Sequence, residues 1–150
     1  MSNLYPWLKF FHLVGLATFL LGHGVSAGVA MVLRGRPVDA VTGTLLKASI
    51  ASSAVTYPGL LLLLGTGVWM GFLGSFWHQG WIWAAIVVLV AVFVVMSALS
   101  IPYHRARDAM GKGQTSEAET SLQRARPLTL LAVGAAGLLI IIFLMVVKPF

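Results

Sequence analysis

The segment ASIASSAVTYPGLLLLLGTGVWMGFLGSFWHQGWIWAAIVVLVAVFVVMSALSIPY, from Ala48 to Tyr103, contains no aspartate, glutamate, lysine or arginine. A helix needs about 20 apolar residues, each rising ~1.5 Å, to cross ~30 Å of hydrocarbon. The segment is therefore too long for one membrane span and long enough for two. Glycine, histidine and glutamine within Gly74–Gly80 predict the hairpin that joins them.

Two further apolar segments lie on either side of this central one. We expect transmembrane helices at about residues 7–33, 52–73, 81–101 and 128–147. The composition agrees, because 59% of the residues are hydrophobic and only 9% are charged, whereas soluble domains are about half apolar and a quarter charged. The sequence predicts an all-α integral membrane protein, a four-transmembrane-helix bundle that forms a single domain over residues 1–150.

Eight of the ten lysine and arginine residues lie in the segments after the first and third spans, while the hairpin between spans two and three has none. These residues are Arg34, Arg36, Lys47, Arg105, Arg107, Lys112, Arg124 and Arg126. By the positive-inside rule these loops are cytoplasmic, so both termini of this multi-pass protein lie outside a bacterial inner (plasma) membrane. The net charge of +6 then indicates topology signals and contacts with anionic lipid, and no nucleic-acid partner.

The residue types that are missing narrow the chemistry. Without cysteine the chain has no disulfide, iron–sulfur cluster or thiolate ligand, so a metal or haem must be held by His, Met, Tyr or backbone oxygen. All four acidic residues fall in the loops, which disfavours an ion-coupled transporter or an intramembrane aspartyl protease. No zinc-protease helix motif or serine elbow occurs.

Two histidines, His12 and His23, fall within the first span. Eleven residues at ~100° each return to within ~20° of the starting direction, so both side chains share one helix face, ~16 Å apart along the axis. Ionisable side chains at membrane depth are functional candidates. The alternative is that each histidine only forms an interhelical hydrogen bond.

Other residues complete the candidate ligand set. The antiparallel course of the spans places Tyr57 and Met96 at about the depth of His23, as further cofactor-binding candidates beside His12. His78 in the hairpin and His104 at the start of the third loop are further metal-binding candidates with the two span histidines. At these interfaces a solvated imidazole is the simpler explanation.

Glycine recurs inside the first two spans. The pairs Gly24-x-x-x-Gly28 and Gly67-x-x-x-Gly71 match the pattern that lets helix backbones approach closely. Close helix packing is the simpler explanation. The alternative is that glycine clears room for a flat macrocycle.

Two motifs carry a resemblance to known families: WLKFFHLVG at residues 7–15 and GHGVS at residues 22–26. Together they resemble small bacterial predicted integral membrane proteins of unknown function, distantly similar to the copper-resistance D proteins. The opening motif is also similar to that of HemJ-type protoporphyrinogen oxidases, four-helix membrane proteins. That second resemblance implies haem b, with His12 as the haem-linked histidine.

Three functional hypotheses follow. The first is a membrane-embedded redox or metal-binding protein, most simply a b-type haem protein for electron transfer, with His12 and His23 as ligands. The second is a copper-handling protein, since imidazole and thioether both bind copper. The third is a cofactor-free accessory subunit of a membrane complex. A membrane redox partner or a second copy of the chain would complete the first; an enzymatic reaction is left open.

Overall fold

The computed structural model describes residues 4–150, which form six α-helices and one short 3₁₀ helix. The elements are α1 (Leu4–Val32), α2 (Ala40–Ala51), α3 (Ser53–Leu73), η1 (Phe76–His78), α4 (Gly80–Gly111), α5 (Thr115–Gln123) and α6 (Pro127–Val147). No strand occurs in this described part of the chain. Four helical segments, α1, α2 with α3, α4 and α6, are long and apolar enough to cross a membrane. The all-α membrane bundle predicted from the sequence is confirmed.

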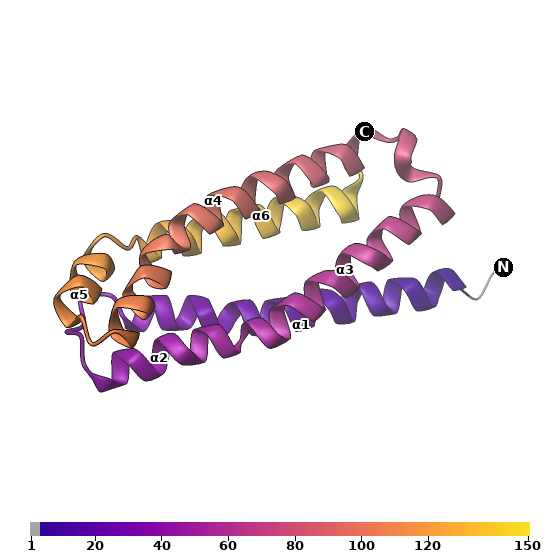
Figure 1. Cartoon of the computed structure of the whole chain (residues 1–150). Coiled ribbons are helices and arrows are strands. Elements are labelled where there is room, and N and C mark those ends of the chain that lie inside the picture. The colour runs from indigo at the N-terminus through magenta and orange to yellow at the C-terminus, as the bar shows by residue number, and fades with distance from the viewer. Residues whose placement is uncertain (1–3) are drawn as a thin grey trace.

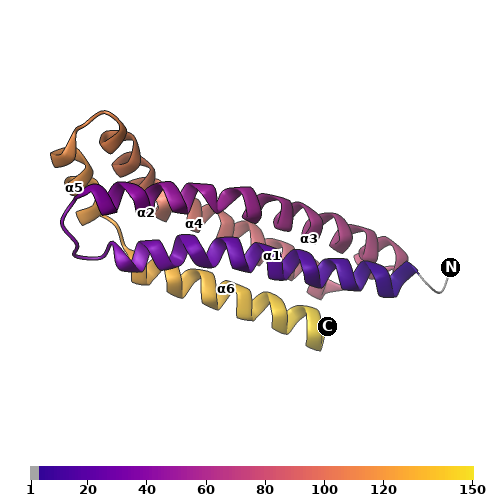
Figure 2. The same ribbon diagram turned by 90° about the horizontal axis from the view of Figure 1, so that it is seen from below.

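The helices form two antiparallel pairs (Figures 1 and 2). In the first pair α1 packs along α3, and in the second α4 packs along α6. The short helix α5 closes one end of the molecule beside the end of α4, and η1 joins the pairs at the other end. We call the end with α5 the basic end, since the helix ends and loops there carry most of the lysine and arginine, and the end with η1 the hairpin end.

The helices extend further at the basic end than the sequence indicates. Helix α4 continues to Gly111, well past the predicted end near residue 101, and α2 runs into α3 with only Ser52 between them. The prediction that His104 begins a connecting segment is therefore wrong, because His104 is an exposed residue within α4. Charged side chains end a membrane span but do not end a helix, since the helix can continue into water.

Helix α2 begins at a well-formed cap. The Asp39 carboxylate accepts a hydrogen bond from the backbone N–H of Thr42 at 2.8 Å, and the Thr42 hydroxyl oxygen accepts one from the backbone N–H of Asp39 at 3.3 Å. This reciprocal capping box satisfies two N–H groups that would otherwise lack partners. It fixes where the chain turns back from α1 toward the membrane.

Glycines set the close approach of α1 and α3. A methyl group on Gly15 would lie 2.7 Å from the backbone nitrogen of Leu63, and one on Gly22 would lie 2.8 Å from that of Thr56. Gly59 meets the backbone of Phe19 in the same way. Only hydrogen fits at these positions, so the two backbones are in direct contact.

The glycine pairs singled out in the sequence do not make this contact. A methyl group on Gly24 or Gly28 would meet nothing within 4 Å. Gly67 faces the ring of His12, and Gly71 faces the indole of Trp77. The backbone contact therefore uses other glycines on the same helices.

The outer surface of the spans is strongly apolar. Side chains such as Leu61, Phe93 and Val146 are 71%, 62% and 74% exposed, respectively. Exposing this apolar surface to water would cost a free energy of about 25 cal/mol for each Å². It is the surface expected of helices surrounded by lipid tails.

Candidate functional site

The two helix pairs bring one histidine and one methionine together. His23 comes from α1 and Met96 from α4, and both approach Gly134 on α6. A methyl group on Gly134 would lie 3.9 Å from His23 Nε2 and 3.8 Å from Met96 Sδ. Both potential ligand atoms thus lie within 4 Å of one point. His23, Met96 and Gly134 come from three different helices, α1, α4 and α6.

The His23 ring is held in a defined orientation. It stacks on the Phe19 ring, one helical turn earlier, with centroids 5.4 Å apart and planes 10° apart. Because Gly59 packs directly against the Phe19 backbone, α3 fixes the position of this stack. The imidazole is half-buried and keeps its Nε2 directed toward Gly134.

His12 is anchored by a different interaction. Its Nδ1 atom lies 3.1 Å from the Thr66 hydroxyl oxygen on α3. That hydroxyl donates its single hydrogen to the carbonyl of Leu62, 2.6 Å away. The hydroxyl oxygen therefore accepts from His12 Nδ1–H, which leaves the lone pair of the neutral ring on Nε2. A histidine held this way through one nitrogen is oriented as metal-binding histidines are.

A cluster of serines lies between His23 and the basic end of the molecule. The Ser26 hydroxyl lies 3.0 Å from that of Ser52 and donates to the carbonyl of Ser49 at 3.2 Å. The cluster joins α1 to the junction of α2 and α3 by polar contacts inside an otherwise apolar bundle. It accounts for Ser52, at the start of the second predicted span, as an interhelical hydrogen-bonding residue.

The remaining predicted site residues are not brought to His23. The Tyr57 side chain is 63% exposed on α3, and His78 and His104 are exposed near opposite ends of the molecule. Among the described residues, no group of three or more His, Cys, Asp or Glu side chains is placed to hold a metal ion. A site at His23 must therefore rely on imidazole and thioether.

Sequence reasoning missed two members of these sites, Thr66 and Gly134. Thr66 is one of several hydroxyl residues in the spans, and only the rotation of α3 shows that it faces His12. Gly134 is one of several glycines in the spans, and only the structure shows that His23 and Met96 both approach it.

The chain belongs to a family described as predicted integral membrane protein (DUF2269), whose model matches residues 6–149. This confirms the expected membership of a family of predicted membrane proteins of unknown function. No curated protein and no solved structure matches the chain. The likeness to copper-resistance D proteins and HemJ-type oxidases stays a prediction.

Proposed function

We propose that this protein binds a soft metal ion, copper(I), within the membrane through His23 and Met96. The observation that carries the proposal is the approach of His23 Nε2 and Met96 Sδ to one point beside Gly134. Imidazole and thioether are neutral ligands that suit copper, and thioether in particular favours the monovalent ion. A buried monovalent ion with neutral ligands leaves less charge to desolvate than a divalent one.

A single ion needs less space between the helices than a larger group does. Metal–ligand bonds of about 2 Å require the two ligand atoms to lie within about 4 Å of each other, which rotation of the Met96 side chain would provide. Met96 has three rotatable bonds and adapts readily. The Phe19 ring, stacked on His23, holds the imidazole in place. Met96 is therefore the ligand that would move to reach the ion.

A b-type haem is the second candidate, supported by the same two residues. Histidine and methionine form a recognised axial pair for haem iron, and helix bundles present such pairs from facing helices. The missing side chain of Gly134 would let a flat ring approach the α6 backbone. A macrocycle needs the two helix pairs to stand further apart than a single ion does, which ranks this candidate second.

Titration with copper(I) tests the leading proposal. We expect detergent-purified protein, kept reduced, to take up one copper(I) per chain in competition with a chromogenic chelator. His23→Gln and Met96→Leu should each weaken binding by at least about tenfold, as expected for the loss of one of two ligands. His78→Gln and Met70→Leu are matched controls outside the site and should bind like the wild type.

The same sample separates the alternatives. A Soret band that appears on haem supplementation and is lost in His23→Gln would select the haem candidate. Protein that takes up neither copper nor haem would end both, and would leave the cofactor-free accessory subunit as the remaining hypothesis.

A further inference from the structure

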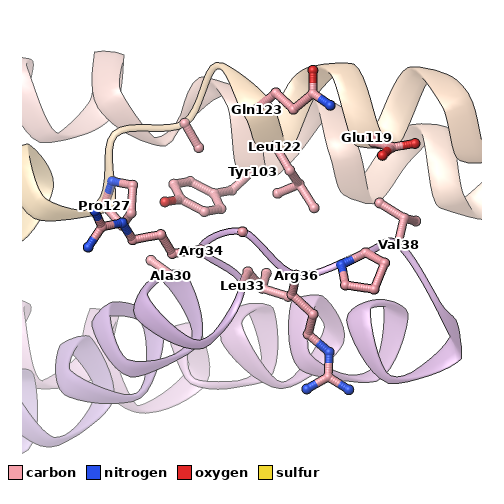
Figure 3. Close-up of a pocket in the computed structure, with 13 residues that line it drawn as sticks. Ala30, Leu33, Arg34, Arg36, Val38, Tyr103, Glu119, Leu122, Gln123 and Pro127 are labelled. Carbon is pink, nitrogen blue, oxygen red and sulfur yellow. The ribbon is translucent and has the colours of Figure 1, made fainter.

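A cavity of about 610 Å³ lies at the basic end, lined by residues other than those of the His23 site. It is formed by the end of α1 and the loop after it, by α4 and α5, and by the start of α6 (Figure 3). Its size is within the range of small-ligand sites, about 300–1,000 Å³. No residue of the His23 site lines it, so it calls for its own explanation.

One end of the cavity gathers groups that favour an anion. Figure 3 shows Arg34 and Tyr103 both extending toward Pro127, the first residue of α6. Arg34 forms no ion pair among the described residues, whose two salt bridges are made by Arg36 and Arg107. Its guanidinium keeps its donors available for a phosphate oxygen.

The Tyr103 hydroxyl strengthens this assignment. The oxygen is buried and has no hydrogen-bond partner among the described residues. Burying a hydroxyl without a hydrogen-bond partner is destabilising, so such a group points to a ligand that would supply the partner. Tyr103 and Arg34 line the same cavity, and a small rotation of the Tyr103 side chain would let its buried hydroxyl donate to an anion held by Arg34.

The other polar side chains of the cavity show which end the anion would occupy. The Arg36 guanidinium is turned away from the opening and lies 3.4 Å from the Asp39 carboxylate. Glu119 and Gln123 lie at the far side of the cavity (Figure 3). No side chain caps the start of α6, so its partial positive charge adds to that of Arg34.

We infer that this cavity binds the phosphate group of a membrane phospholipid, held by Arg34 and Tyr103. The cavity lies where the apolar spans give way to charged segments, which is the depth of lipid headgroups. A free phosphate ion offers the same chemistry and is the other possible source. The inference does not depend on copper or haem.

Binding of a short-chain phosphatidylglycerol to the purified full chain tests this inference. We expect Arg34→Gln to weaken binding about tenfold, as expected for the loss of a charge-assisted contact, and Tyr103→Phe to weaken it about threefold. Arg105→Gln removes the same charge from an exposed position outside the cavity and should change the affinity less than about twofold. Tyr103→Phe also keeps the test open if Arg34→Gln does not fold.

Further binding measurements identify the ligand. Competition by millimolar inorganic phosphate would show that the site takes free anion, whereas lipid binding that resists phosphate would show a headgroup site. Equal losses in Arg34→Gln and Arg105→Gln would mean general attraction to anionic lipid and would overturn the inference. Equally tight binding of a diacylglycerol without phosphate would overturn it too.

Discussion

His12 Nδ1 and the Thr66 hydroxyl oxygen lie 3.1 Å apart, and this contact joins α1 to α3 in the half of the bundle toward the hairpin end. It is a polar link inside an apolar interface: the hydroxyl hydrogen of Thr66 goes to the Leu62 carbonyl, and the hydroxyl oxygen accepts from the histidine. The link fixes the tautomer of the ring.

Thr66→Val tests the energetic value of this link. We expect a loss of about 1 kcal/mol in the free energy of unfolding, the usual size for an interhelical hydrogen bond in membrane proteins. Unfolding by dodecyl sulfate in mixed micelles, followed by circular dichroism, measures it. Thr66→Ser keeps the hydroxyl and should retain most of the stability; equal losses in both variants would contradict the hydrogen bond.

Gly22→Ala and Gly24→Ala form a matched pair within one helix. At Gly22 the added methyl group would meet the backbone of Thr56 at 2.8 Å, so we expect a destabilisation of about 1–3 kcal/mol from overpacking. At Gly24 it meets nothing within 4 Å, so the helix propensity of alanine should leave stability unchanged or raise it by up to about 1 kcal/mol. The same micelle unfolding assay compares them, and similar results for both would contradict the observed rotation of α1.

The Asp39 cap predicts a pH dependence at the basic end. The backbone N–H of Thr42 donates to the Asp39 carboxylate and lowers its pKa below the ordinary 3.8. Because the folded-state pKa is the lower one, the cap stabilises fully above the unfolded pKa and is lost as pH falls through the folded value. Thermal unfolding at about pH 7 and about pH 3 should show this loss in the wild type.

Asp39→Asn is the control for that experiment. Asparagine caps helices about as well as aspartate but does not titrate. We expect this variant to lack the part of the acid-induced loss that comes from the cap. An unchanged difference between the two pH values would show that the loss arises at another residue.

The orientation predicted from the basic loops is open to labelling. Since the chain has no cysteine, single cysteines can be introduced at exposed positions near opposite ends, His78→Cys at the hairpin and Ser116→Cys in α5. We expect a membrane-impermeant maleimide added to intact cells to label the first and not the second. The reverse result would invert the bundle in the membrane.

The spans could be predicted from the sequence because backbone groups in oil must pair within their own helix. An uncharged run as long as Ala48–Tyr103 leaves few alternatives to a helical hairpin. The helix ends at the basic end were harder to predict, because α4 carries charged residues into water as a helix. His104 shows this error directly.

The site was only partly predictable, because it depends on helix rotation. Spacing placed His12 and His23 on one face of α1, yet the two meet different surroundings: His12 meets α3, while His23 is directed at α6. Gly22 and Gly24 differ by two positions, about 200° around the helix, and only one of them meets α3. Both positions are glycine, so the sequence alone does not indicate which of the two packs against α3.

The division into two helix pairs has a thermodynamic consequence. His23 belongs to the pair of α1 and α3, and Met96 to the pair of α4 and α6. An ion bridging the two residues would fasten one pair to the other, so its affinity and the spacing of the pairs would be reciprocally linked. Lateral pressure or bilayer thickness would then tune metal retention, and a loaded site would stiffen the bundle against the surrounding lipid.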